Sequence, residues 1–426
     1  MEQQTDRREF LKYAAASVAA WNLITWELPA WMPRLAFAPE GQAPNGDVLL
    51  CIFMRGGVDG LNVVIPHADT AYFDLRPQLA IPAPAGGKDN TLINLDGFFG
   101  LHPALRNLKD LWDSHALAII HAAGSPDPTH SHFDAMDYME RGTPGEKSIP
   151  TGWIARHLQS INSENNSPFR AVGMGTILQS SLRGPVQATV LQSIADFHLR
   201  GRLSGISEIQ KDLASLYNLD VNKPLDDAAS QTWKAIDMLA KINPKTYKPA
   251  NGASYPGSNY GLALQQVAQL IKSEVGLEVA CVDIGGWDTH SGQGSVTDGT
   301  LPRLLQEFGD GLAAFYKDLG NLNKRVTTVT MSEFGRRAYE NSSGGTDHGH
   351  GNIMFILGGG IKGGKVYGDW PGLSKDKLYG PGDLGVTTDF RDVLAEIVQN
   401  RLLNAKLDQV FPGYQPKLRG ITQKQK

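Results

Sequence analysis

Aspartate and histidine side chains occur together in two short segments of this sequence, in patterns that could bind a metal ion. Trp287-Asp288-Thr289-His290 places a carboxylate two residues from an imidazole, and Asp347-His348-Gly349-His350 places a carboxylate beside two imidazoles. An isolated Asp-x-His pair is more often hydrogen-bonded structure. Mixed aspartate and histidine ligands without paired cysteines suit zinc, manganese or iron rather than a thiolate site. We expect a divalent metal cofactor, with zinc as the first candidate and manganese, iron or calcium as alternatives.

Ser131 is a second residue whose type and position could do chemistry. It directly precedes residues 132–139, which predict a helix. A hydroxyl at a helix N-terminus beside a metal can be ionised and act as a nucleophile. The simpler alternative is an N-cap, in which the hydroxyl accepts a hydrogen bond from a backbone N–H of the first turn. On the sequence alone, the N-cap is favoured.

The elements that would position these residues are strands alternating with helices. Continuous apolar runs predict buried strands at residues 48–53, 116–121, 277–283, 326–331 and 353–357. Helical periodicity covers residues 301–319 and 259–275, and a further helix follows a cap at Thr388 or Asp389. This alternation predicts an α/β fold with a mostly parallel central sheet and helices on both faces.

Polar side chains follow these predicted strands. In chain order they are Asp59, then His130, Ser131, His132 and Asp134, then Asp288 and His290, then Glu333 and Arg336, and then Asp347, His348 and His350 before the fifth strand. Ligands of open α/β sheets bind beyond the carboxyl ends of the strands. If the strands are parallel neighbours, these groups converge on one edge of the sheet.

The first 38 residues predict a twin-arginine (Tat) export signal. Arg7 and Arg8 precede an uncharged stretch over residues 13–26, and Ala36-Phe37-Ala38 offers small residues for a signal peptidase. The alternative is an N-terminal helix with a chance arginine pair. We expect the Tat translocase as a partner during export and a periplasmic or secreted location. The segment could be cleaved, or stay uncut as an anchor.

Composition restricts the class of protein. The 426 residues carry a net charge of −4, which gives no basic excess for a nucleic-acid partner. Beyond the signal, no stretch is long and apolar enough to span a bilayer. Cys51 and Cys281 lie in apolar runs, which favours buried thiols over a disulfide. We expect a single domain over residues 47–410, with a helical cap inserted around residues 195–260.

Five motifs together resemble a known protein family. They lie at residues 54–60 (MRGGVDG), 130–134 (HSHFD), 286–290 (GWDTH), 332–336 (SEFGR) and 345–349 (GTDHG). This set resembles a large bacterial family of Tat-exported proteins of unknown function, grouped with the alkaline-phosphatase-like superfamily of phosphatases, phosphodiesterases and sulfatases. The resemblance covers nearly the whole chain after the signal, and it implies an alkaline-phosphatase-like fold.

The resemblance also implies roles for individual residues. Asp59 matches the metal-binding Asp that follows the first strand of that superfamily. Ser131 matches its nucleophile, with Thr129 as a rival. Asp288 and His290 resemble its Asp with a nearby His, although the usual spacing is wider.

The remaining metal positions depart from the superfamily pattern. Glu333 occupies the place of a metal-binding Asp, but Phe334 stands where a ligand His is usual. His348 resembles the last His before its strand. A different alignment makes Asp347 and His348 the Asp-His pair and leaves His350 as the last His. Both alignments leave the second of two metal sites incomplete.

The leading functional hypothesis is an exported, metal-dependent hydrolase of phosphate or sulfate esters. Ser131 or a metal-bound water would be the nucleophile, and Arg55 or Arg336 would neutralise the anionic group. We assign Trp287 and His132 to substrate binding. The substrate would be a small anionic ester or a sulfated or phosphorylated glycan. The alternative, suggested by the incomplete metal set, is a non-catalytic exported binding or scaffold protein in envelope or polysaccharide assembly.

Overall fold

A computed structural model describes residues 46–84, 90–194, 235, 238–239 and 246–425. The predicted signal, residues 1–38, lies outside the described residues, and so does most of the predicted cap at 195–260. In the part of the chain that is described, no helix combines the length and the apolar composition needed to cross a bilayer.

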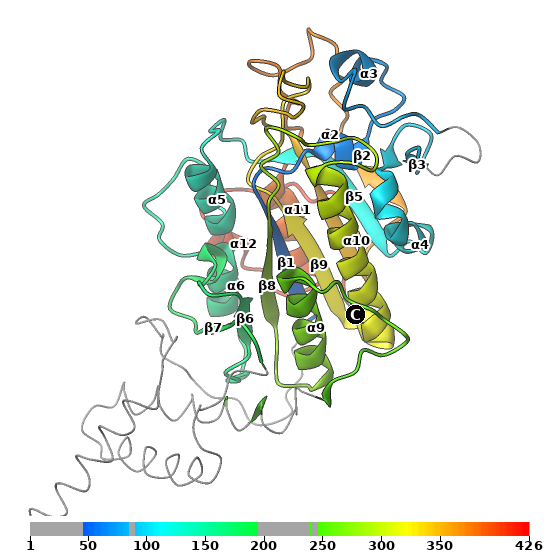
Figure 1. Ribbon diagram of the computed structural model, residues 1–426. Coiled ribbons are helices and arrows are strands. Elements are labelled where there is room, and N and C mark those ends of the chain that lie inside the picture. The colour runs from blue at the N-terminus through cyan, green and yellow to red at the C-terminus, as the bar shows by residue number, and fades with distance from the viewer. Residues whose placement is uncertain (1–45, 85–89, 195–234, 236–237, 240–245, 426) are drawn as a thin grey trace, which may run out of the picture.

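A nine-stranded sheet forms the centre of the molecule (Figure 1). Its order is β11-β5-β10-β9-β1-β8-β6-β7, and β12 also pairs with β5. The strands are β1 (Val48–Arg55), β5 (Leu117–Gly124), β6 (Ala171–Met174), β7 (Thr189–Leu191), β8 (Val279–Gly285), β9 (Val326–Met331), β10 (Asn352–Gly358), β11 (Lys365–Tyr367) and β12 (Thr388–Asp389). Among these strands β10 runs antiparallel to its neighbours and the other pairings are parallel.

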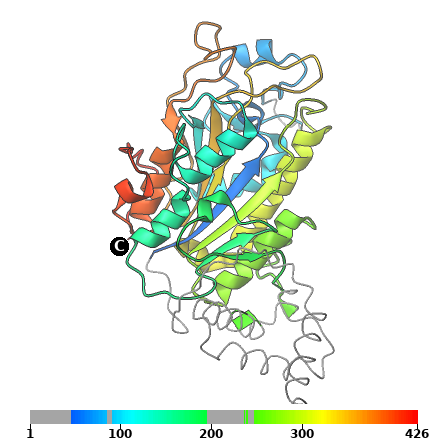
Figure 2. The same cartoon turned by 90° about the vertical axis from the view of Figure 1, so that its left-hand side faces the viewer.

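Helices cover both faces of this sheet, as the two views show (Figures 1 and 2). Leu50, Ile52 and Met54 of β1 pack in one apolar cluster, with α9 (Asn259–Lys272), α10 (Thr300–Leu319), α4 (Lys109–Asp113) and the 3-10 helix η1 (Pro103–Leu108). Leu49 and Phe53 pack in the other, with α5 (His132–Arg141), α6 (Trp153–Ser160), α11 (Phe390–Asn400) and α12 (Leu407–Val410). Since side chains alternate across a strand, a continuous apolar run serves both faces.

Short elements complete the described chain. They are α2 (Gly60–Val63), α3 (Ala71–Leu75), the three-stranded sheet of β2 (Val64–Ile65), β4 (Gly100–Leu101) and β3 (Ile93–Asn94), and the 3-10 helices η2 (Ser180–Leu182) and η4 (Gly320–Arg325).

The predicted α/β fold, with a mostly parallel sheet and helices on both faces, is confirmed. The five predicted strands correspond to β1, β5, β8, β9 and β10. Of the two predicted caps for α11, Asp389 is the one used, and its carboxylate accepts a hydrogen bond from the Arg391 N–H (2.9 Å). Cys51 and Cys281 are buried free thiols, as predicted, and face each other in the register of β1 and β8.

Candidate metal centre

The ends of four strands meet at one edge of the sheet. β1, β5, β8 and β9 run in the same direction, so their carboxyl ends share this edge. Because β10 is antiparallel to β9, its amino end lies at the same edge. The start of α5, the segment after β8 and the segment that joins β9 to β10 are therefore brought together.

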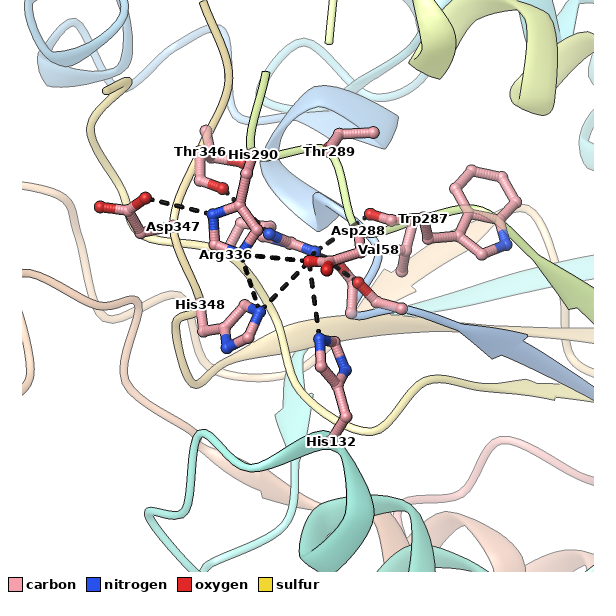
Figure 3. A network of polar contacts seen from close by, with 12 residues as sticks. Val58, His132, Trp287, Asp288, Thr289, His290, Arg336, Thr346, Asp347 and His348 are labelled. Atoms are coloured by element: carbon pink, nitrogen blue, oxygen red, sulfur yellow. Dashed lines mark hydrogen bonds and ion pairs between the residues drawn. The ribbon is translucent and has the colours of Figure 1, made fainter. Parts of the chain in front are cut away.

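Three imidazoles surround one carboxylate at this edge (Figure 3). The Nε2 atoms of His290 and His348 each lie 3.2 Å from Asp288 Oδ1, and that of His132 lies 3.5 Å from it. The Nε2 atoms of His290 and His348 are 2.9 Å apart. We call these four residues the ligand cluster.

The second nitrogen of each imidazole faces an acceptor. His132 Nδ1 lies 2.8 Å from Glu333 Oε1, and His290 Nδ1 lies 3.3 Å from Asp347 Oδ1. His348 Nδ1 lies 2.9 Å from the backbone oxygen of His130. A carbonyl or an ionised carboxylate can only accept, so each Nδ1 carries the hydrogen. Each neutral ring then presents a lone pair at Nε2, the arrangement in which histidine binds a metal.

A cation between these nitrogens would satisfy their lone pairs. His290 Nε2 and His348 Nε2 are too close for two unprotonated nitrogens without one, and His132 Nε2 is buried with no hydrogen-bond partner in the described structure. Nitrogen and oxygen ligands about 2.0–2.1 Å from a tetrahedral zinc lie roughly 3.3 Å apart. The separations of 2.9 and 3.2 Å among Asp288, His290 and His348 agree with that spacing, and the ligand atoms of His132, Asp288 and His348 all lie within 4.8 Å of one another. The residues present therefore fit a small divalent cation.

Water can reach this cluster. The side chains of Asp288 and His290 are 47% and 44% exposed. A structural zinc site is closed by protein ligands, whereas a catalytic site keeps access for water or substrate. The exposure of this cluster favours the second kind.

Arg336 is buried next to the cluster and holds Asp288 in place. Its guanidinium is buried and donates to backbone oxygens of Gly57 (2.6 Å) and Thr346 (2.9 Å) and to Asp288 Oδ1 (2.5 Å). Burial raises the pKa of Asp288, but the hydrogen bond and charge of Arg336 outweigh burial and hold this pKa below its usual value. Asp288 is thus kept as a carboxylate.

The imidazoles differ in their electrostatic surroundings. The hydrogen bond to Glu333 raises the pKa of His132. Burial, followed by the charge of Arg336, lowers the pKa of His348. A hydrogen bond from Asn341 lowers the pKa of Asp347, which keeps it an acceptor for His290.

Glycines allow the close backbone approach that places His348. Arg336 and His348 form a bridge between the two arms of the β9–β10 segment. A Cβ on Gly349 would lie 2.3 Å from the backbone carbon of Arg336, and one on Gly335 would lie 1.9 Å from the backbone oxygen of Gly351. Neither position has room for a side chain.

The structure brings together some of the predicted metal residues. Asp288, His290 and His348 lie in the ligand cluster, and Glu333 and Asp347 each hold one of its imidazoles. His132, which we assigned to substrate binding, faces Asp288 with the other two imidazoles.

Two predicted metal residues lie apart from the cluster. Asp59 is fully buried, and its Oδ2 accepts hydrogen bonds from Arg76 and Gln293, each at 2.6 Å. His350 is buried and its ring stacks on Tyr379 with centroids 4.9 Å apart. Burial lowers the pKa of His350 to about 4.

The predicted substrate-contacting residues are engaged with protein groups. Arg55 is paired with Asp283 (2.9 Å) and Glu140 (3.3 Å). Trp287 is fully buried and donates to the backbone oxygen of Ile284 (2.9 Å), so its indole offers no surface to a substrate. Ser131 caps α5, because its hydroxyl accepts from the Asp134 N–H (3.4 Å).

Several supporting residues carried no sequence signal. Gln293 and Arg76 are fully buried behind the cluster, in segments whose letters show no apolar periodicity. Asp383 lies 3.1 Å from His130, whose backbone oxygen holds His348. Burial raises the pKa of Asp383. Their positions follow from the folded loops rather than from any local pattern.

The chain matches, over residues 47–425, the model of a family described as "Protein of unknown function (DUF1501)". It belongs to this family. No curated protein matches the chain. Membership by itself therefore assigns no activity.

Three solved structures resemble the chain at low identity. A protein in the alkaline phosphatase superfamily from Vibrio parahaemolyticus has 11% identity and a TM-score of 0.34, covering 85% of this chain and 71% of that one. The lipoteichoic acid synthase LtaP from Listeria monocytogenes has 10% identity and a TM-score of 0.33, covering 91% and 78%. Alkaline phosphatase from the Antarctic bacterium TAB5 has 10% identity and a TM-score of 0.28, covering 75% and 93%. Such low TM-scores carry no conclusion about activity.

Proposed function

We propose that this protein is a metal-dependent hydrolase of phosphate or sulfate esters. The observation that supports the proposal is the convergence of three imidazole Nε2 atoms on Asp288 Oδ1, each ring held through Nδ1 by an acceptor. When bound, a divalent cation there supplies Lewis acidity toward an ester oxygen and toward water.

Hydrogen bonds within the protein fix the orientation of the four side chains of the ligand cluster. Glu333, Asp347 and the carbonyl of His130 fix the three rings, and Arg336 fixes Asp288. Such outer partners orient the ligands and fix their tautomers.

An anionic ester suits this edge of the sheet. Helix α5 begins at His132, so the positive end of its dipole lies beside the cluster. Ser131 uses an oxygen lone pair to cap α5, which leaves its O–H free to donate and its oxygen at the helix start. Ser131 and water are the two candidate nucleophiles, and the class of substrate, phosphate or sulfate esters, comes from the resemblance noted in the sequence.

Metal analysis tests the centre. We expect the purified protein to hold one equivalent of a divalent metal, and the Asp288→Ala/His348→Ala double variant to hold none. His350→Gln is the matched control, because it removes an imidazole from the same loop but outside the cluster. Equal metal content in the double variant and the wild type would overturn the site.

Hydrolysis assays test the activity. The metal-loaded protein should cleave at least one of an aryl phosphate, a phosphodiester and an aryl sulfate. If Ser131 is the nucleophile, Ser131→Ala abolishes cleavage while metal content stays at the wild-type value. If water is the nucleophile, cleavage persists. A metal-loaded protein that cleaves none of the three substrates would favour the binding or scaffold function.

We also propose export through the Tat pathway, with the periplasm or the cell exterior as the place of action. The support is the arginine pair Arg7-Arg8 before an uncharged stretch. A folded, metal-loaded hydrolase is compatible with a route that carries folded proteins.

A further inference from the structure

A buried amide lies behind the ligand cluster and contacts both segments that carry its ligands. Gln293 and Thr346 are fully buried, and Thr289 is only 2% exposed. Thr289 stands between Asp288 and His290, and Thr346 stands two residues before His348. Figure 3 places both threonines beside the cluster.

Gln293 joins the two threonines through one atom. The hydroxyls of Thr289 and Thr346 donate to Gln293 Oε1 at 2.9 and 2.8 Å. On its other side Gln293 Nε2 donates to Asp59 Oδ2 at 2.6 Å. A carboxylate can only accept, so it fixes which side of the amide is the nitrogen and directs the oxygen at the threonines.

Asp59 is itself anchored. Arg76 donates to Asp59 Oδ2 (2.6 Å) and to Asn62 Oδ1 (2.7 Å), and also to the backbone oxygens of Ala338 (2.8 Å) and Arg337 (2.7 Å). Arg76 and Asp59 are both fully buried, so the charge of Asp59 is balanced by a guanidinium of the protein. Gln293 is therefore held by a buried carboxylate that is itself fixed by Arg76.

We propose that Gln293 is a positioning residue of the metal centre, which sets the separation between the Asp288–His290 segment and the Asp347–His348 segment. The backbones of these segments are already joined by the Thr346 N–H to the Thr289 oxygen (3.1 Å). The shared amide oxygen adds a second, side-chain connection at the same point. The inference rests on the proposed function in that a metal must bind the cluster, and it needs no particular ester substrate.

Isosteric variants of Thr346 test the proposal. Thr346→Val keeps the shape and removes the hydroxyl, whereas Thr346→Ser keeps the hydroxyl. We expect Thr346→Val, and more so Thr289→Val/Thr346→Val, to weaken zinc binding by up to about tenfold, the lower end of the cost of losing a direct partner of a ligand, because these hydroxyls hold the ligand segments rather than the ligands. Thr346→Ser should restore affinity to near that of the wild type. The visible absorption of bound Co²⁺ should change in the valine variants, because it reports ligand geometry.

Thr327→Val is the matched control. Thr327 is a fully buried threonine whose hydroxyl donates to Asp47 Oδ2 (2.7 Å) near the start of β9, away from the ligand cluster. The Thr327→Val variant also loses one hydrogen bond of a buried threonine hydroxyl. We expect its zinc affinity and its Co²⁺ spectrum to match those of the wild type.

The outcomes separate this inference from the proposed function. Wild-type affinity and spectrum in the valine variants overturn the role of Gln293 and leave the hydrolase proposal standing. An equal loss in Thr327→Val also overturns it, because the effect would then reflect general stability. Weakened binding in the valine variants of a protein that cleaves no ester supports the inference while the hydrolase proposal fails. A wild-type protein that binds neither zinc nor cobalt overturns both.

Discussion

The three imidazoles of the ligand cluster are held by three different acceptors, so they are not equivalent. His132 has the ionisable side chain of Glu333 as its partner, and His348 has a backbone oxygen that no substitution can remove. Glu333 also accepts from the Gly56 N–H (2.8 Å), which ties the ring to the end of β1. The orientation of His132 therefore depends on a single side chain.

Replacing this side chain should loosen the metal. We expect Glu333→Gln to weaken zinc binding by about tenfold, since a neutral amide holds the imidazole less firmly and makes it less basic. Competition with a coloured chelator measures this directly. Glu340→Gln, which changes an acidic side chain bound to the backbone of Gln78 and Leu79, should leave the affinity unchanged. An unaltered affinity in Glu333→Gln would contradict the role given to this residue.

The sequence predicts Asp288, His290 and His348 as metal ligands and places His132 at the same edge of the sheet, but it assigns His132 to substrate binding rather than to the metal. Asp288 and His290 lie in one short motif and His348 lies in another, so both motifs can be recognised in the sequence. The approach of His132 depends on the start of α5 meeting the ends of β8 and β9, which no local pattern encodes. Gln293 was missed for the same reason, because a buried amide among polar loop residues resembles any exposed one.

At the scale of elements, the reversed direction of β10 brings His348 to the cluster. A parallel β10 would need a crossover connection, whereas an antiparallel neighbour of β9 can be reached by a loop that stays at one edge. The apolar runs predicted all five central strands, since burial on both faces leaves a clear signal. The apolar runs could not predict whether a strand is parallel or antiparallel to its neighbours, because both kinds of buried strand have the same apolar pattern.

The close packing of the β9–β10 segment makes Gly349 sensitive to substitution. We expect Gly349→Ala to push this arm away from Arg336, to cost about 1–3 kcal/mol of folding stability, and to weaken metal binding. Chemical denaturation and zinc titration check the two effects. Gly285→Ala is the control, because a Cβ there, at the end of β8 on the same edge, meets no atom within 4 Å. Equal behaviour of the two variants would show that the contact at Gly349 is easily relieved.

At the scale of the whole molecule, buried neutral histidines couple stability to pH. His121 in β5 donates through Nε2 to the Val64 oxygen (2.9 Å) and accepts from the Ala122 N–H (2.9 Å), so both nitrogens are used by the neutral ring. Burial lowers the pKa of His121 to about 4, and that of His102 to about 4. In the unfolded chain both would titrate near 6.5.

Stability should therefore fall as the pH drops from about 6.5 to about 4. In that window the unfolded chain binds protons that the folded protein does not, and each such histidine costs about 1.4 kcal/mol per pH unit. Urea unfolding in the presence of a chelator measures the slope. In His121→Gln the free energy of unfolding should change less steeply with pH, by the contribution of one histidine. This difference in slope does not depend on the absolute stability of the variant. A wild-type stability that stays constant over this window would contradict the prediction.

The proposed export also concerns the whole chain. We expect Arg7→Lys/Arg8→Lys to leave the protein in the cytoplasm of a bacterium with a working Tat pathway, because the translocase recognises the arginine pair. Fractionation followed by immunoblotting measures the distribution. Arg34→Lys, a change of the same kind later in the same segment, is the control and should be exported normally. Export of the double variant at the wild-type level would rule out this route.

The residues of the ligand cluster come from three chain segments that are far apart in the sequence. These segments are the start of α5, the residues after β8 and the residues before β10. A cation held there acts as a reversible cross-link among segments that would move independently in the unfolded chain. Opening any one of them then requires release of the cation. Added metal should therefore slow amide hydrogen exchange in all three segments together, and a chelator should restore it in all three. Local opening at this edge of the protein would become a single event governed by the metal.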